Sequence, residues 1–277
     1  MSTISLKQLA REWLPPRLIR LVRQPNKGSE TGYEGLFDTW EDANLHCTGY
    51  DAQHILNKVL AATLQVKRGE AAFERDSVLF DKIEYPWFLL SGLMWAAARN
   101  GGRLNVLDFG GALGSSFFQS RAMLVALPEV RWNIVEQAHY VQAGREYIQD
   151  ETLRFYASVD ECLLENEPNV ILLSSVLQYL PSPDNIIAQL AKADAPVLII
   201  DRTPFSVSEK NEILIQHVPA YIYDASYPLW VFSEGEFLRK LNSKWNLVAQ
   251  TLSPEGRVRL GTGFEFSYQG MLLESKK

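Results

Sequence analysis

An acid followed by closely spaced glycines marks the stretch RLNVLDFGGALGSSFF, residues 103–118. Asp108 ends an apolar run, and Gly110, Gly111 and Gly114 follow it before a segment that predicts a helix. Glycine permits positive φ and close approach of a ligand, and the free amides of a helix N-terminus favour negative groups. A carboxylate at the same point favours a cation. The stretch therefore predicts a site for a ligand that carries both charges.

The glycines do not fit the dinucleotide-binding fingerprint G-x-G-x-x-G. If its last two glycines were Gly111 and Gly114, the first would fall on Phe109. Asp108 would also repel a pyrophosphate. Two alternatives stay open at this point: a different nucleotide-using enzyme, and a tight structural turn that holds no ligand.

Further polar residues follow the next two apolar runs. Glu136 ends one of them, 22 positions past Gly114, and a carboxylate at that distance can accept hydrogen bonds from both ribose hydroxyls. Gln137 would border an adenine. Ser158, with Asp160, follows the third run and could contact the adenine amine, although a simple helix cap explains it equally well.

The elements that must position these residues alternate between short apolar runs and helical patterns. Five such runs, separated by helices, predict a parallel sheet with helices on both faces, and two later runs bring the strands to seven. The predicted strands are 104–109, 131–136, 153–156, 169–175, 195–201, 245–252 and 264–275. The predicted helices are 51–76, 86–99, 114–127, 138–149, 159–165, 183–193 and 233–242, and 202–232 is predicted to be irregular. We expect a helical N-terminal extension or cap over residues 1–100 and a Rossmann-like domain over residues 101–277.

The strings LDFGGALGSS and NVILLSSVLQYLPSPD resemble motifs of the class I methyltransferases that use S-adenosylmethionine. Gly110 and Gly114 match the glycine motif, Ala112 replaces its middle glycine, and Gly111 is extra. The resemblance implies methyl transfer to an oxygen or nitrogen of a small molecule, with S-adenosylhomocysteine as product. The residues show no clear constellation of metal ligands, so no metal is predicted. The donor-binding residues that it implies are Asp108, Gly110, Gly111, Gly114, Glu136, Gln137, Ser158, Ser174 and Ser175.

A narrower resemblance rests on IIDRTPFS, QHVPAYIYDASYPLWVFS, GYEGLFDTWEDA and FERDSVLFDKIEYPWFLL. These strings are similar to a bacterial family of methyltransferases that is associated with surface-glycan pathways. The resemblance implies a sugar or glycan precursor as the acceptor. A non-catalytic protein that binds the donor, or a scaffold, is the alternative that the residues leave open.

The acceptor side is predicted around the end of the fifth strand and the segment that follows it. Methyl transfer is an in-line displacement that needs an aligned acceptor shielded from water, and an oxygen acceptor benefits from a base. His217 is the first candidate for the base because histidine titrates near neutral pH, and Asp201 is the second. His217 could instead pack an ordered loop. The substrate-binding candidates are Gln178, Tyr179, Arg202, Tyr221, Tyr223 and Tyr227.

Composition narrows the class of protein. The chain has 277 residues and a net charge of −6, which disfavours nucleic acid as a partner. Two cysteines give neither a disulfide framework nor a zinc spacing, so we expect a cytoplasmic protein.

Residues 5–23 are basic and amphipathic, with Lys7, Arg11, Arg17, Arg20 and Arg23 against Glu12. They could contact the inner face of an anionic membrane weakly, pack on their own domain, or join a second subunit in a homodimer.

Overall fold

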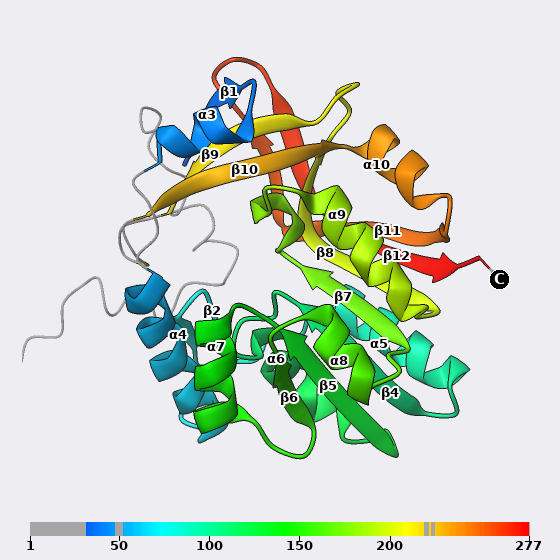
Figure 1. Cartoon of the computed structure of the whole chain (residues 1–277). Helices are drawn as coiled ribbons and strands as arrows, with labels where there is room; N and C mark the ends of the chain where they lie inside the picture. Colours follow the sequence, from blue (N-terminus) through cyan, green and yellow to red (C-terminus); the bar gives the residue numbers. More distant parts are fainter. Residues whose placement is uncertain (1–31, 48–51, 219–221, 223–224, 277) are drawn as a thin grey trace, which may run out of the picture. The chain divides into compact units, whose positions relative to one another are not determined.

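The computed structural model of the chain describes residues 32–47, 52–218, 222 and 225–276 (Figure 1). The basic segment 5–23 and two of the predicted substrate residues, Tyr221 and Tyr223, lie outside these ranges.

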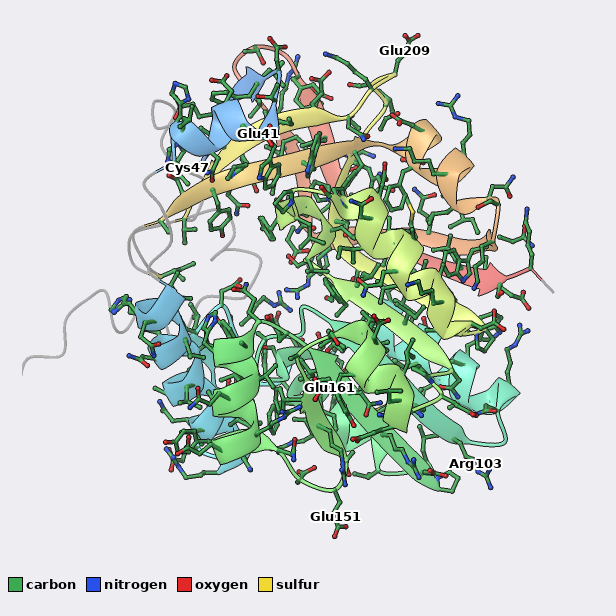
Figure 2. All side chains as sticks on the ribbon, in the orientation of Figure 1. Glu41, Cys47, Arg103, Glu151, Glu161 and Glu209 are labelled. Atoms are coloured by element: carbon green, nitrogen blue, oxygen red, sulfur yellow. The ribbon has the colours of Figure 1, made fainter. Side chains whose placement is uncertain are left out.

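Strand β4 (Arg103–Phe109), which carries the acid of the glycine motif, is central in the sheet. It pairs in parallel with β5 on one side and β7 on the other. Parallel β6 and β8 extend the two flanks, and β12 and β11 add an antiparallel end beyond β8. The bounds are β5 (Glu129–Val135), β6 (Leu153–Tyr156), β7 (Val170–Ser174), β8 (Val197–Ser206), β11 (Trp245–Arg259) and β12 (Glu265–Ser275). Arg103, labelled in Figure 2, begins β4 at the amino edge, so Asp108 lies at the carboxyl edge.

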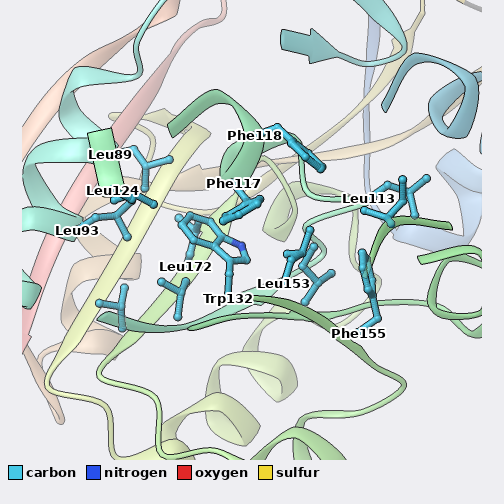
Figure 3. Close-up of a cluster of buried hydrophobic side chains, with 14 of the residues drawn as sticks. Leu89, Leu93, Leu113, Phe117, Phe118, Leu124, Trp132, Leu153, Phe155 and Leu172 are labelled. Atoms are coloured by element: carbon cyan, nitrogen blue, oxygen red, sulfur yellow. The ribbon is translucent and has the colours of Figure 1, made fainter. Parts of the chain in front are cut away.

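Helices cover both faces of this parallel core, as the alternating pattern predicted. One face packs against α4 (Ala52–Lys67), α5 (Trp87–Arg99), α6 (Ser115–Leu124) and α7 (Ala138–Ala143). The other face packs against α8 (Val159–Glu165), α9 (Pro183–Leu190) and α10 (Glu234–Leu241). Figure 3 shows the first of these cores, where the fully buried Trp132 of β5 lies beside Phe117 of α6. Because apolar side chains fill both faces, the strands read as continuous apolar runs in the sequence.

The prediction that 202–232 is irregular is wrong. Strand β8 continues to Ser206, and β9 (Glu212–His217) and β10 (Ser226–Ser233) follow it as an antiparallel pair. The end of β10 joins β8 through Phe232 opposite Phe205, beyond the last residue of β7. These strands in a Tyr- and Pro-containing stretch give little sequence periodicity. Pairing within the sheet, and not the local sequence pattern, therefore determines that these residues form strands.

Residues before position 100 contribute strands as well as helices, and within the described ranges the sheet has ten strands rather than the seven predicted. Strand β1 (Tyr33–Phe37) pairs with β9, and α3 (Trp40–Leu45) packs on β9 and β10. The helix predicted over 51–76 ends at Lys67, and a hairpin of β2 (Phe73–Arg75) and β3 (Val78–Phe80) follows. Its turn residues Asp76 and Ser77 have φ of 51° and 65°, as the type I′ hairpin turn requires.

Several short helical segments complete the chain. A π-helical turn, Gly144–Ile148, continues α7, and 3₁₀ turns occupy Leu177–Tyr179 and Ala191–Ala193. The turn at Leu177–Tyr179 directly follows β7, so it holds Gln178 and Tyr179 at the carboxyl edge of the sheet.

Candidate active site

The turn between β4 and α6 is shaped by two glycines that no larger residue could replace without movement. A Cβ on Gly110, whose φ is 72°, would lie 2.3 Å from Val176 Cγ2. A Cβ on Gly111 would lie 2.5 Å from the Asp108 carboxylate. The glycine that is extra to the resembled motif therefore makes room for the motif's own acid. Ala112 adopts φ of 49°, in the left-handed region that favours glycine.

Asp108 is buried beneath this turn, with 1% of its surface exposed. Its Oδ2 accepts a 2.9 Å hydrogen bond from the Trp132 indole nitrogen, and its Oδ1 has no partner among the described residues. Burial, and secondarily the charge of Glu136, raises the pKa of Asp108 to about 7, although the Trp132 bond and Arg202 oppose this. A cationic ligand nearby would favour the ionised form of this carboxyl group.

Glu136, directly after β5, contacts the turn from the neighbouring strand. Its carboxylate accepts the backbone N–H of Gln137 at 2.6 Å, and a second backbone bond comes from Ala112. Burial raises the pKa of Glu136, and both backbone bonds lower it. The Gln137 side chain is exposed at the start of α7. A groove lined by Ala138, Val141, Gln142, Arg145, Glu146 and Ala157 includes the sequence neighbours of Gln137 and Ser158, the two residues predicted near an adenine.

Ser158 has a structural role in this arrangement. It precedes α8, and its hydroxyl accepts the N–H of Glu161 at 3.0 Å, which is an N-cap. The structure thus shows the helix cap that the sequence offered as the second explanation for Ser158.

A polar network joins the ends of β7 and β8. Asp201 Oδ2 accepts the Ser174 hydroxyl at 3.1 Å, and Arg202 Nη2 donates to the same hydroxyl at 3.2 Å. Gln178 Nε2 donates to the Ser175 hydroxyl at 3.0 Å and to the Arg202 carbonyl at 3.3 Å. The network therefore brings together predicted donor-side, substrate-side and catalytic residues.

Two members of the network hold strained backbone. Ser175 and Arg202 have φ of 56° and 49°, a region that side chains other than glycine rarely adopt. Gln178 is fully buried, yet its Oε1 has no partner among the described residues. Strain and unsatisfied polar atoms cluster at functional sites, where the surrounding fold holds them for ligand contact.

Tyr179 connects this network to the antiparallel strands. Its hydroxyl donates to Gln216 Oε1 of β9 at 3.0 Å, and its ring meets Tyr227 of β10 edge to face, with centroids 5.0 Å apart. Burial raises the pKa of Tyr179, so its hydroxyl stays protonated as a hydrogen-bond donor. Of the predicted substrate residues, Gln178, Tyr179, Arg202 and Tyr227 thus form a connected set.

His217 does not belong to this connected set of residues. Successive side chains of a strand point to opposite faces, and Gln216, the preceding residue, faces Tyr179. His217 therefore points to the opposite face of β9, where its Nε2 lies 2.8 Å from Glu34 Oε2 of β1. The ring is 46% exposed. Asp201, the second candidate for a base, is the one that the structure places in the network.

Sequence reasoning missed the β2–β3 hairpin, which packs on the start of α6. Glu74 of β2 is 2% exposed and accepts the Ser115 hydroxyl and, at 3.1 Å, the Ser77 N–H. Burial raises the pKa of Glu74. Gly69, followed by two short aromatic and β-branched runs around Asp76–Ser77, is the sequence signal that predicts such a hairpin.

A separate cavity of about 280 Å³ lies beside β5 and β6. Arg131, Asn133, Arg154 and Tyr156 line it with polar side chains. No group of three His, Cys, Asp or Glu side chains comes together as a metal site within the part of the chain that the structure describes.

Comparison with known proteins gives remote likenesses only. No protein-family model matches the chain, and no curated protein matches its sequence. Among solved structures, the N-terminal domain of EvdMO1 with S-adenosylhomocysteine and D-fucose has a TM-score of 0.49 at 11% identity, covering 82% of this chain and 98% of its own. Magnesium protoporphyrin IX methyltransferase from Synechocystis PCC 6803 scores 0.44 at 12% identity, covering 83% and 99%. CalS10, an amino pentose methyltransferase from Micromonospora echinaspora, scores 0.40 at 12% identity, covering 67% and 89%. Likeness at this level concerns the α/β fold and assigns neither an activity nor a ligand to this chain.

Proposed function

We propose that the protein is an S-adenosylmethionine-dependent methyltransferase that acts on an oxygen or nitrogen of a small molecule. The observation that carries the proposal is the Gly110–Gly114 turn between two acids, the buried Asp108 and the half-buried Glu136, at the ends of adjacent parallel strands. Ligands of open α/β sheets bind outside the carboxyl ends of the strands, where this turn lies.

The residues fit a donor that carries two positive groups and one carboxylate. Asp108 would supply a negative field beneath the turn, and Glu136 would accept hydrogen bonds from the ribose hydroxyls. The groove that includes Ala138 and Ala157 would accept the adenine, with Gln137 and Ser158 at its border. The free N–H groups at the start of α6 would hold the carboxylate.

The donor would supply an electrophilic methyl group on a sulfonium, and the chain would align and deprotonate the acceptor. The acceptor atom forms the new bond to the methyl carbon as the carbon–sulfur bond breaks, and the acceptor loses one proton. Asp201 is our candidate to take that proton, because Ser174 and Arg202 fix its carboxylate at the end of β8. Gln178 and Tyr179 would orient the acceptor.

A sugar or glycan precursor is the acceptor class that we propose. Tyr179 and Tyr227 offer aromatic edges and a hydroxyl, and Gln178 offers an unsatisfied buried oxygen. Strands β1, β9 and β10, on the far side of Tyr179, would cover the acceptor. The resemblance of IIDRTPFS and its companion strings to a glycan-associated family supports the same class.

Calorimetry with S-adenosylmethionine, S-adenosylhomocysteine and NAD tests the donor. We expect both adenosyl compounds to bind and NAD to fail. Glu136→Ala should weaken binding by about 1.5–3 kcal/mol, as for a hydrogen bond to a charged group. Glu151→Ala, at the exposed residue labelled in Figure 2, is the control that should bind as the wild type does. NAD binding without adenosyl binding would support the alternative of a different Rossmann-type enzyme.

A further inference from the structure

The residues of the candidate active site are covered, although they lie at the carboxyl edge of the sheet. Asp108, Gln178 and Asp201 are all buried, and so is Thr203 of β8 just beyond Asp201. In open α/β sheets this edge is where ligands bind. A ligand that reaches these side chains must therefore pass an element that covers the strand ends.

The β2–β3 hairpin occupies the position of such an element. Glu74 of β2 accepts the hydroxyl of Ser115, the first residue of α6. The next residue, Arg75, forms an ion pair with Glu255 of β11 at 3.7 Å. Because consecutive side chains of a strand point to opposite faces, β2 lies between the start of α6 and β11.

The register of the sheet shows where on β11 this contact falls. Pairing of β11 with β12 skips residues 253–256, which bulge between the pairs made by Gln269 and Ser267. Those two residues pair in turn with Thr203 and Phe205 of β8, so the bulge is level with the end of β8, past the end of β7. Strands β7 and β8 lie between β4, which α6 follows, and the β12–β11 pair. A hairpin that contacts both α6 and the bulge therefore spans the carboxyl ends of β7 and β8.

The hairpin has an apolar contact of its own and exposed connections to the rest of the chain. Phe73 of β2 stacks on Phe80 of β3 with ring centroids 4.4 Å apart. Neither ring belongs to the two main cores that the described residues form. The flanking residues 68–70 and 81–84 are exposed. The ion pair to β11 is itself partly exposed and too long for a hydrogen bond, and pairs of this kind contribute little to stability.

We propose that the β2–β3 hairpin is a lid over the candidate active site and that the Arg75–Glu255 ion pair holds it closed. The inference rests on the proposed function, because the ligands that the lid admits are the methyl donor and its acceptor. Opening breaks the ion pair and turns the hairpin about α4, which contacts both of its strands. Closure keeps water away from the methyl transfer and holds the ligands in line.

Surface plasmon resonance on the immobilised full chain measures the association and dissociation rate constants of S-adenosylhomocysteine. Arg75→Gln and Glu255→Gln each remove one charge of the ion pair, and the double variant Arg75→Glu with Glu255→Arg exchanges the two charges. Arg259→Gln is the matched control, because Arg259 of β11 forms a 3.0 Å ion pair with Glu265 of β12.

If the ion pair holds the lid closed, each single variant should raise both rate constants about 2- to 5-fold, the factor by which an exposed ion pair favours one state. The dissociation constant should stay nearly unchanged, because the lid opens more often for entry and for exit alike. The double variant should return both rate constants toward those of the wild type, and Arg259→Gln should match the wild type.

Unchanged rate constants in both single variants, or a rise in the dissociation rate constant alone, would overturn the inference and leave the methyltransferase proposal intact. Absence of S-adenosylhomocysteine binding to the wild type would instead overturn the proposed function. Hydrogen exchange then tests the lid by itself. The hydrogen-bonded amides of β2 and β3 should exchange about 2- to 5-fold faster in Arg75→Gln than in the wild type, and equal exchange would contradict the lid.

Discussion

Asp108 shows how one buried side chain determines the shape of its surroundings. Its carboxylate occupies the space that a Cβ on Gly111 would need, and the Trp132 indole is its one hydrogen-bond donor among the described residues. The second oxygen has no partner there. A charge buried this way is costly, which is why the pKa of Asp108 rises to about 7.

The raised pKa predicts how stability changes with pH. The native state holds the Asp108 proton up to pH of about 7, whereas the unfolded chain releases it near its ordinary value of 3.8. Between these values the native state binds more protons, so the free energy of unfolding falls as pH rises, by up to about 1.4 kcal/mol per pH unit. Above pH of about 7 this contribution is constant.

Urea unfolding of Asp108→Asn at several pH values between 4.5 and 8 checks this prediction. Below neutral pH, the substitution should reduce the decrease of the unfolding free energy with rising pH. Asparagine keeps the hydrogen bond from Trp132 but does not titrate. Asp81→Asn, at an exposed position, should keep the slope of the wild type. Identical slopes for Asp108→Asn and the wild type would contradict the assignment of this group.

Asp201 and His217 give a second prediction at the level of single residues. We expect Asp201→Asn to lower turnover on the true acceptor by about 10²–10⁴-fold, the usual contribution of a general base, with donor affinity nearly unchanged. His217→Gln should leave turnover near that of the wild type, because the ring faces Glu34 on the other side of β9. Loss of turnover in His217→Gln alone, measured with donor in excess, would restore His217 as the base.

At the level of elements, the β4–α6 turn is fixed by both backbone conformation and packing. Gly110 needs a left-handed φ, and Val176 after β7 fills the space where its side chain would be. Val176 therefore fixes the position of the turn relative to β7. Of this, the sequence alone could predict the glycine requirement, but not the contact with a residue 66 positions later.

Alanine at Gly110 measures how tightly the turn is held. Gly101 is the matched control, because its φ of 64° is close to the 72° of Gly110 and no atom lies within 4 Å of its missing Cβ. Gly101→Ala should cost about 1 kcal/mol from backbone strain alone, whereas Gly110→Ala should cost about 1–3 kcal/mol more from overpacking. Val176→Ala should recover part of the extra cost. Equal losses of unfolding free energy in the two alanine variants would show that Val176 does not constrain the turn.

At the level of the whole molecule, early and late segments of the described chain join one sheet. Strand β1 joins β9, some 180 positions later, and the Tyr33 hydroxyl lies 2.8 Å from that of Tyr268 in β12. Residues 33–37 therefore belong to the antiparallel strands that contact Tyr179 through Gln216 of β9. No helix among the described residues is both long enough and apolar enough to span a membrane.

The basic segment 5–23 leads to a prediction for the intact chain. We propose that it binds anionic membrane surfaces weakly, since each basic residue near such a surface contributes about 1 kcal/mol. The full chain should then co-sediment with phosphatidylserine-containing vesicles at low salt and be released at high salt. Replacing Arg17, Arg20 and Arg23 together by glutamine should abolish co-sedimentation. If the triple variant still pellets equally, the segment serves its own domain or a second subunit instead.

The sequence by itself determined the parallel core and the place of the glycine turn. Continuous apolar runs ending in Asp108 and Glu136 specify strands buried on both faces, and this information is local. It did not determine which way His217 points, because a side chain's face follows from the pairing of β9 with β1 and β10. Nor did it reveal that Glu74 of the β2–β3 hairpin accepts the Ser115 hydroxyl of α6, since these residues are 41 positions apart in the sequence. Tertiary structure decided these points because burial and charge proximity depend on long-range packing, which no short window of sequence contains.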